Sequence, residues 1–302
     1  MCAVSVSVIL VNWNGWQDTA ECVASCASLC GVDARLVVVD NHSEDDSIEQ
    51  LHERFPDLRV VRAEANHGFA GGNNLGIEIA LAEQAEYVWL LNNDTTVAPD
   101  SLAELVADAE RHPEAGMFGS KVLYSAEPGV IWFAGGTLDP FKAGYPRHIG
   151  ADQPDDGRFD KPSVTEFLTG CSLLVRREVI ERIGMLPEEY FMYWEDVDWC
   201  WRAREAGWEC RYVPTSRVWH KVASSLRGTG YVDLQYETRN RLRFYSHHER
   251  RRLARVLFWT IRDALLLAIR GRVRNACARL AGVLDYLCGR TGRIPSRTQG
   301  RD

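Results

Sequence analysis

Apolar and polar stretches alternate along the first 125 residues with the spacing of strands and helices. A short, continuous apolar run predicts a strand that is covered on both faces, and an amphipathic stretch predicts a helix. Strands that alternate with helices at this spacing predict a parallel sheet with right-handed crossovers. We expect strands at residues 4–11, 35–40, 58–62 and 87–91, and helices at residues 16–29, 43–55 (with Ser43 as N-cap), 71–84 and 99–111.

The middle of the chain has a different pattern. Short strand-like runs flank a loop rich in Pro, Asp and Gly near residues 152–162, which predicts an antiparallel extension of the sheet. From about residue 232 onward the pattern is mainly helical and basic. Between residues 116 and 231 we expect strands at 121–124, 130–133, 164–168, 172–175, 208–213 and 217–219, and helices at 178–184 and 196–206.

Polar residues follow each of the four predicted N-terminal strands. Open parallel sheets bind ligands beyond the carboxyl ends of their strands, so we expect these residues to share one cleft. They are Asn12 and Asn14 after the first strand, Asp40 and Asn41 at the second, Asn66 and His67 after the third, and Asn92, Asn93 and Asp94 after the fourth.

Two segments carry residues that could hold a divalent metal ion. Asp94 follows a rigid apolar strand, and Mg²⁺ or Mn²⁺ prefers oxygen ligands and commonly bridges a carboxylate to a diphosphate. Asn and Asp also favour turns on their own account, which is the alternative for residues 92–94. His220 follows a short predicted strand. It becomes a metal ligand only if the fold places it beside Asp94, and is otherwise a packing residue.

Residues 194–198 open a predicted helix with the sequence Trp-Glu-Asp-Val-Asp. Acidic residues in a first turn can serve only as partners of the helix dipole. Three carboxylates exceed that need, and the aromatic residues around them would exclude water and stack on a sugar. Such surroundings would raise the pKa of one carboxylate, as a general base requires.

Two further segments have features of binding loops. Residues 66–74 place glycines before a predicted helix, where backbone N–H groups can approach a phosphate, although the run matches no P-loop. Residues 221–230, which include Arg227, are rich in Ser and Gly. That composition suits a mobile lid, and it equally suits an ordinary loop.

Composition and charge narrow the class of protein. The hydrophobic fraction of 46% and the charged fraction of 25% are ordinary for a globular protein. Residues 250–302 hold thirteen arginines and three aspartates, which give this tail a net charge of +10. Since the whole chain has a net charge of −7, residues 1–249 carry −17. The acidic body argues against binding nucleic acid. The tail predicts either a helix that lies on an anionic membrane or one that packs on the domain with a basic face in solvent. Residues 256–269 are too short and too charged to span a bilayer.

The nine cysteines suggest no disulfide framework. Cys22, Cys26 and Cys30 share one face of a predicted helix, but about 12 Å of helix axis separates the first from the last, which is too far for one metal ion. We interpret them as small core residues in a reducing compartment.

Seven motifs occur in order between residues 4 and 245: VSVILVNWNG, VVVDNHSED, NHGFAGGNN, LLNNDT, FLTGCSLLVRR, FMYWEDVDWCWRAREAG and VPTSRVWH. Together they resemble family 2 of the inverting glycosyltransferases, in particular its bacterial rhamnosyltransferase-like branch. The resemblance implies a GT-A fold, an α/β architecture in which a Rossmann-like, mostly parallel sheet is flanked by helices. It divides the chain into a catalytic domain at residues 1–245, with a nucleotide-sugar half (1–115) and an acceptor half (116–245), and a basic helical segment at 246–302.

The resemblance also implies a role for each matching position. Asp196 matches the catalytic base, with Glu195 as its acidic neighbour, and Asp94 and His220 match the ligands of Mg²⁺ or Mn²⁺. The first acid of the family's metal-binding D-x-D motif is Asn92 here, which leaves most of the metal binding to Asp94. The donor-binding positions are Asn12, Asp40, Asn66, Gly71, Asn73, Asn92 and Asp94, and we place Gly170, Cys171 and Trp194 on the acceptor side.

The resemblance implies transfer of a sugar, with rhamnose as our expectation, from a dTDP-, UDP- or GDP-linked donor to an acceptor hydroxyl. The acceptor is a glycan, a lipid-linked glycan or a natural product, and the location is cytoplasmic, with a membrane-peripheral position if the tail binds lipid. Two alternatives are a sugar-1-phosphate nucleotidyltransferase and a catalytically silent nucleotide-sugar-binding protein. The first would need a glycine-rich N-terminal loop with Arg and Lys, which residues 12–15 do not offer.

Overall fold

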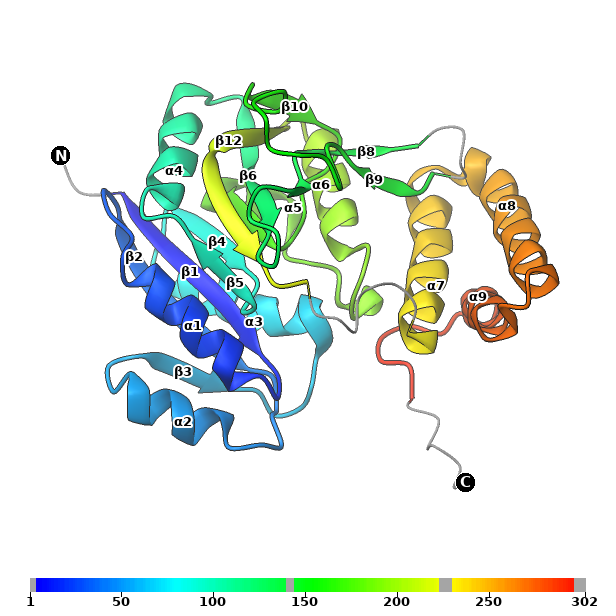
Figure 1. Cartoon of the computed structure of the whole chain (residues 1–302), viewed down its shortest axis with the longest axis horizontal. Helices are drawn as coiled ribbons and strands as arrows, with labels where there is room; N and C mark the ends of the chain where they lie inside the picture. The colour runs from blue at the N-terminus through cyan, green and yellow to red at the C-terminus, as the bar shows by residue number, and fades with distance from the viewer. Residues whose placement is uncertain (1–3, 140–143, 223–229, 296–302) are drawn as a thin grey trace.

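The computed structural model describes residues 4–139, 144–222 and 230–295. Its N-terminal half alternates strands and helices, as the sequence pattern predicts (Figure 1). The elements of this half are β1 (Ser5–Asn12), α1 (Trp16–Cys26), β2 (Asp33–Asp40), α2 (Ser47–Arg54), β3 (Arg59–Arg62), α3 (Gly68–Ala82), β4 (Tyr87–Leu91), β5 (Thr95–Val97) and α4 (Ser101–Arg111).

The second half adds shorter strands and then helices. The strands are β6 (Ala115–Tyr124), β7 (Ile131–Phe133), β8 (Gly136–Leu138), β9 (Pro146–His148), β10 (Ser163–Thr165), β11 (Ser172–Arg176) and β12 (Glu209–His220). The helices are α5 (Arg177–Ile183), the 3₁₀ turn η1 (Glu188–Tyr190), α6 (Glu195–Glu205), α7 (Tyr231–His248), α8 (Arg250–Ile269) and α9 (Val273–Leu287).

One large sheet organises the molecule, in the order β3-β2-β1-β4-β11-β6-β12-β10. Strands β3, β2, β1 and β4 are mutually parallel, whereas β11 runs antiparallel to both β4 and β6. Strand β5 joins by pairing antiparallel with β12, and β8 and β9 form a separate hairpin. The mostly parallel sheet with an antiparallel extension confirms the predicted α/β architecture.

Both faces of this sheet are buried, which explains why β1 has a continuous apolar run. Val6, Val8 and Leu10 point into one hydrophobic cluster, and Ile9 points into the cluster on the opposite face. The burial of both faces leaves the strand ends as the places where polar side chains can gather.

The structure corrects several predicted local features. Helix α2 begins at Ser47, so Ser43 is not its N-cap; the Ser43 hydroxyl instead accepts the backbone N–H of Asn14 at 2.9 Å. The two strands predicted on either side of Pro214 form one strand, β12, with a register shift between Val213 and Arg217 that accommodates the proline.

The cysteine prediction holds in part. Cys22 and Cys26 are buried core residues, but Cys30 is exposed because α1 ends at Cys26. All eight cysteines that the structure describes are free.

The segment that suits either a mobile lid or an ordinary loop is not tested, because residues 223–229, which include Arg227, lie outside the described residues.

Three helices form the C-terminal part of the chain and lie together at one side of the molecule (Figure 1). Val256 of α8 and Val283 of α9 join the hydrophobic core, whereas Phe258, Leu265 and Ile269 are more than half exposed. These helices therefore pack on the domain and also present an apolar surface. Helix α7 continues through residue 245, so the domain boundary stays a prediction. Among the described residues, no helix is long and apolar enough to cross a membrane.

Candidate active site

The carboxyl ends of β1 and β2 hold two polar side chains in contact. Asn12 and Asp40 are register partners at the ends of these parallel strands, and the Asn12 amide donates to Asp40 Oδ1 at 3.0 Å. The other carboxylate oxygen, Asp40 Oδ2, accepts the backbone N–H of Ser43 at 3.0 Å. Both side chains are fully buried, so the strand pairing and these bonds fix the Asp40 carboxylate at the sheet edge.

A chain of hydrogen bonds links this corner to the end of β4. Thr19 of α1 donates to Asn12 Oδ1 at 2.7 Å, and the Asn93 amide donates to the Thr19 hydroxyl at 2.9 Å. The end of β4 is therefore tied to the ends of β1 and β2, and the three predicted polar clusters lie together.

The loop after β3 joins the same edge. The Asn41 amide donates to Asn66 Oδ1 at 3.3 Å and to the Gly68 carbonyl at 2.9 Å. Helix α3 begins at Gly68 rather than at Gly71, so Gly71 and Asn73 lie in its first turns, and the Asn73 amide donates to the Phe69 carbonyl at 2.9 Å. The structure thus places the predicted donor-binding loop beside β2, and its contacts with a donor stay a prediction.

Strand pairing brings His220 to Asp94. The last residue of β12 is His220, which is the register partner of Thr95 in β5, one residue after Asp94. His220 Nε2 lies 3.0 Å from Asp94 Oδ1 and 3.4 Å from the Asn92 amide nitrogen. The fold thus brings His220 beside Asp94, which favours a ligand over a packing residue, and its role as a metal ligand stays a prediction.

The two side chains fit a cation that binds together with substrate phosphates. Burial of the His220 imidazole lowers its pKa, but the interactions with Cys171 and Asp94 outweigh burial and raise the pKa of His220 to about 10. A metal ion that binds His220 would therefore have to displace a proton from the ring. Among the described residues, no three His, Cys, Asp or Glu side chains are grouped to hold a metal ion. One carboxylate and one imidazole suit Mg²⁺ or Mn²⁺ if diphosphate oxygens and water complete the coordination.

Asp196 is connected to this pair through two consecutive residues. Its Oδ2 accepts the backbone N–H of Gly170 at 2.9 Å, and the carbonyl of the next residue, Cys171, accepts the N–H of Asn92 at 3.0 Å. The Cys171 thiol also contacts His220. Gly170 also allows the Phe69 ring to pack against this turn, because a Cβ at residue 170 would lie 2.7 Å from that ring. The fold thus places the predicted base beside the predicted metal ligands.

The environment of Asp196 suits proton transfer. Burial raises the pKa of Asp196, although the N–H groups of Gly170 and Val197 act in the opposite direction. Burial and the neighbouring Asp196 raise the pKa of Glu195 well above its ordinary value. Asp196 is only partly buried by surface area, whereas Glu195 is 5% exposed, and the role of Asp196 as a base stays a prediction.

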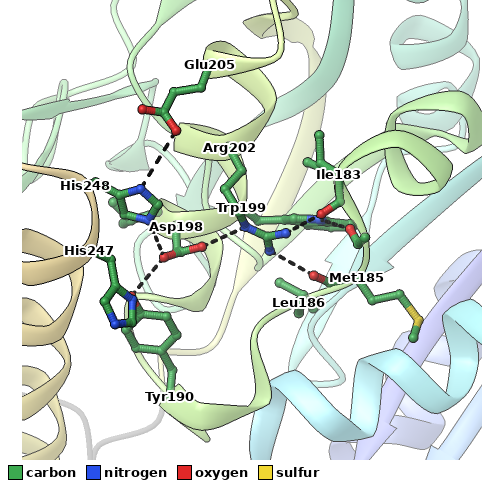
Figure 2. A network of polar contacts seen from close by, with 12 residues as sticks. Ile183, Met185, Leu186, Tyr190, Asp198, Trp199, Arg202, Glu205, His247 and His248 are labelled. Carbon is green, nitrogen blue, oxygen red and sulfur yellow. Dashed lines mark hydrogen bonds and ion pairs between the residues drawn. The ribbon is translucent and has the colours of Figure 1, made fainter.

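The third acid of the run, Asp198, anchors helix α6 (Figure 2). Its Oδ1 accepts a hydrogen bond from Arg202 Nε at 2.8 Å. Its Oδ2 accepts a hydrogen bond from the Tyr190 hydroxyl at 2.9 Å and lies 2.7 Å from His248 Nε2. Burial opposes ionisation, but the bonds with His248 and Arg202 dominate and lower the pKa of Asp198. Asp198 therefore has structural partners in α6 and α7.

The segment before α6 has an unusual backbone. Phe191, Tyr193 and Trp194 all have positive φ angles, between 66° and 79°, which costs free energy for residues other than glycine. Asn240 of α7 holds this segment, because its amide nitrogen lies 2.9 Å, 2.8 Å and 2.9 Å from the carbonyl oxygens of residues 190, 192 and 193. Helix α7 thereby determines where α6, and with it Asp196, begins.

Replacing Asn240 with Ala should lower the free energy of unfolding by about 2–3 kcal/mol, because buried carbonyl groups lose their donor. The same variant should also lose turnover, since the strained segment then relaxes. Chemical denaturation and steady-state kinetics would measure both effects. Asn275→Ala, the same change at a partly exposed position of α9, should shift stability by about 0.5 kcal/mol or less. Equal behaviour of the two variants would contradict the role of Asn240.

One predicted site residue lies in the hydrophobic core instead of on an open surface. Trp194 is only 3% exposed and packs on Phe244, with ring centroids 5.2 Å apart. Tyr190 and Trp199 of the expected aromatic wall are also buried. These rings support α6 from behind, because the helix needs an apolar face against α7. We therefore correct the assignment of Trp194 to the acceptor side.

Three site residues did not emerge from the sequence pattern. Thr19 and Ser43 bridge Asn12 to its neighbours, and Trp132 of β7 is half-buried with its ring centroid 4.8 Å from that of His220. Each lies within an ordinary helix, turn or strand pattern, so only the tertiary structure reveals its place. Trp132 gives the Asp94–His220 pair an aromatic neighbour.

The fold is similar to that of solved glycosyltransferase structures. The structure is similar to that of GalNAc-T7 solved with UDP, GalNAc and Mn²⁺, with a TM-score of 0.64, 19% identity, and coverage of 81% of this chain but 48% of that one. It also matches the mannosyltransferase PcManGT from Pyrobaculum calidifontis, solved with GDP-Man and Mn²⁺, with a TM-score of 0.60, 16% identity, and coverage of 94% and 87%. The fold is therefore the GT-A fold of glycosyltransferases.

The family follows from sequence comparison. The model of glycosyl transferase family 2 matches residues 7–184, and the chain belongs to this family. A curated relative, the N-acetylglucosaminyl-diphospho-decaprenol L-rhamnosyltransferase of Mycobacterium tuberculosis, is 28% identical over 293 residues, covering 90% of this chain and 94% of the relative. The protein is thus a glycosyltransferase with a rhamnosyltransferase among its relatives, which sets aside the nucleotidyltransferase alternative.

Proposed function

We propose that this glycosyltransferase is metal-dependent and inverts the configuration of the transferred sugar, with Asp196 as general base. The donor is a nucleotide-diphosphate sugar, and we propose dTDP-rhamnose first, because a rhamnosyltransferase matches almost the whole chain. The observation that carries this proposal is the contact chain from Asp196 through Gly170 and Cys171 to the Asp94–His220 pair. These contacts support the proposal, because they link Asp196 to the residues that would hold the leaving diphosphate.

The reaction is a single displacement. Asp196 takes the proton of the acceptor hydroxyl while that oxygen forms a bond to the anomeric carbon. The bond from the anomeric carbon to the diphosphate oxygen breaks, and the nucleoside diphosphate leaves with the electron pair. Attack opposite the leaving group inverts the configuration, so no covalent nucleophile is required.

Asp94 and His220 would hold the divalent cation, Mg²⁺ or Mn²⁺, at the diphosphate. When bound, the cation would supply positive charge to the leaving group. Asp40 and Asn12, fixed at the ends of β2 and β1, would contact the nucleoside. Gly170 and Cys171, next to Asp196, would border the acceptor.

We propose a lipid-linked glycan as acceptor, since the relative's name specifies a sugar on diphospho-decaprenol. Because such a lipid is anchored in a membrane, the enzyme would work at the inner face of the cell membrane. The exposed apolar residues of α8 and the arginines of residues 250–302 support this position.

A donor screen tests the proposed function. The melting temperature of the protein should be measured with Mn²⁺ and each of dTDP-rhamnose, UDP-sugars and GDP-mannose. A ligand that binds only the native state raises the melting temperature, so the true donor should raise it most, and we expect this to be dTDP-rhamnose. Incubation of that donor with a prenyl-diphosphate-linked N-acetylglucosamine should then release nucleoside diphosphate, and NMR of the product should show inverted configuration. Binding without any turnover would instead identify a silent binding protein, and a retained configuration would refute the mechanism.

The membrane position makes a separate prediction. Changing Leu265 and Ile269, which are 58% and 80% exposed, to Glu should reduce co-sedimentation with phosphatidylglycerol vesicles by roughly 10-fold or more, because each change removes apolar contact and adds negative charge. Val164→Glu, at a 55% exposed position of strand β10, serves as the control and should bind like the parent protein. Equal pelleting of all variants would end the membrane proposal.

A further inference from the structure

A large open pocket of about 1260 Å³ lies among the C-terminal helices. One wall comes from the beginning of α7, at Tyr231, Val232 and Gln235, and another from α9. The segment after α9, which Figure 1 shows returning from α9 toward the start of α7, forms the third side with residues 290–295. None of the predicted donor-site residues lines this pocket, so it is a separate feature of the chain.

The pocket carries an excess of positive charge. Four arginines line it, at positions 239, 274, 290 and 293, against one acid, Asp285. Arg290 pairs with Asp285 at 2.8 Å, and Arg239 is buried and donates to backbone carbonyls. Arg274 and Arg293 are exposed, and within the described parts of the chain neither has an ion-pair partner. These two guanidinium groups are therefore available for an anionic ligand.

The lining also includes apolar residues that reach the exposed surface of α7 and α9. Val232 and Leu284 line the pocket and are 41% and 60% exposed. Leu284 also belongs to an exposed apolar stripe along α9 that includes Leu280 and Leu287. An apolar path therefore leads from the arginines to the outer face of the C-terminal helices.

The pocket wall is attached to the segment that precedes the proposed base. Arg239 donates to the Tyr190 carbonyl at 3.1 Å, and Tyr236 stacks on Phe191 with ring centroids 5.5 Å apart. The backbone from Phe191 reaches Asp196 within five residues. The pocket wall and the proposed base are therefore connected through residues 190–196.

We infer that this pocket binds the diphosphate and the first isoprenoid units of a lipid-linked acceptor. The inference rests on the proposed function and extends it from an acceptor class to a location. Arg274 and Arg293 contact the diphosphate, and Val232 and Leu284 contact the chain. The lipid then continues along α9 to the bilayer, while the sugar it carries extends past residues 190–194 toward Asp196. An anionic head joined to an apolar tail matches both halves of the pocket, which neither a free anion nor a neutral lipid does.

Direct binding of a short prenyl diphosphate tests the location. Titration calorimetry with farnesyl diphosphate in EDTA, which excludes metal-dependent binding at the donor site, should give saturable binding to the full chain. Inorganic pyrophosphate and farnesol should each bind at least roughly 10-fold more weakly, since each lacks one half of the ligand. Arg274→Ser and Arg293→Ser should each weaken farnesyl diphosphate binding by roughly 10-fold. Arg255→Ser, at an exposed position of α8 outside the pocket, should not.

Three results would overturn the inference: equal binding of pyrophosphate and farnesyl diphosphate, unchanged binding by both pocket variants, or an equal loss in the Arg255 control. A kinetic test separates this failure from failure of the proposed function. Both pocket variants should raise KM for the prenyl-diphosphate-linked sugar by roughly 10-fold while hydrolysis of the donor in water is unchanged. Absence of any donor turnover in the parent protein would refute the proposed function and leave the binding result standing.

Discussion

Replacing Asp196 with Asn should reduce the rate of sugar transfer by roughly 10²–10⁴-fold, the usual contribution of a general base, while donor binding changes little. The amide is isosteric, and its oxygen can still accept the Gly170 N–H that Asp196 accepts at 2.9 Å. The variant therefore removes the proton acceptor and keeps the bond from Gly170, and it gives up only the bond from the Val197 N–H, which Asp196 Oδ1 accepts at 2.8 Å. Turnover and donor affinity, measured separately by kinetics and calorimetry, would show a loss in kcat alone.

The matched control for this variant is Glu205→Gln. Glu205 lies on the same helix, but its side chain is 59% exposed, so the control should keep near-normal activity. The pH profile gives a second readout. Burial raises the pKa of Asp196, and only the ionised form can accept a proton, so the rate should fall as the pH drops through that raised value. Asp196 would be excluded as the base if Asp196→Asn transferred sugar at the parent rate, or if its rate fell at low pH in the same way as that of the parent.

The sequence is sufficient to predict the sheet because both of its faces are covered. Val6, Val8 and Leu10 contact one core cluster and Ile9 the other, so burial alone dictates a continuous apolar run. The extent of individual elements was less predictable. Pro214 interrupts the apolar pattern of β12, yet the strand continues past it with a register shift, and such an irregularity depends on the neighbouring strand rather than on local sequence.

The candidate site divides in the same way. Residues at strand ends, such as Asp40 and Asp94, could be located because strand ends have a defined position in an open sheet. The proximity of His220 to Asp94 depends on the pairing of β12 with β5, two segments more than a hundred residues apart, which no local pattern encodes. Trp194 shows the converse: its neighbours suggested a binding surface, but α7 covers it.

Helix α7 connects the proposed chemistry with the C-terminal helices. Asn240 holds residues 190–193, His248 holds Asp198 of α6 (Figure 2), and Arg239 lines the arginine-rich pocket. Helix α7 is therefore part of the structure that positions the proposed base. Because α7 shares contacts with both regions, an acceptor bound at the pocket would lie against the same helix that fixes the start of α6.

Removal of the metal should have an effect comparable to loss of the base. With EDTA, and in Asp94→Asn or His220→Ala, transfer should fall by at least about 100-fold, because stabilisation of the leaving diphosphate is worth several kcal/mol. Excess Mn²⁺ should restore the EDTA-treated parent fully and the two variants only in part, since each keeps one of the two side chains that lie 3.0 Å apart.

Asp100→Asn is the control for this experiment, because Asp100 is an exposed residue at the start of α4 and lies away from the pair. Its activity and its response to Mn²⁺ should equal those of the parent. Isothermal titration of Mn²⁺ with the nucleoside diphosphate present would measure the affinity of the protein for Mn²⁺. This affinity should be weaker in Asp94→Asn and in His220→Ala than in the parent. Since the proposal assigns the ion to two side chains of the described residues, Mn²⁺ should bind much more weakly when the nucleotide is left out. Full transfer in EDTA, or tight Mn²⁺ binding that survives loss of Asp94, would show that Asp94 and His220 form an ordinary ion pair.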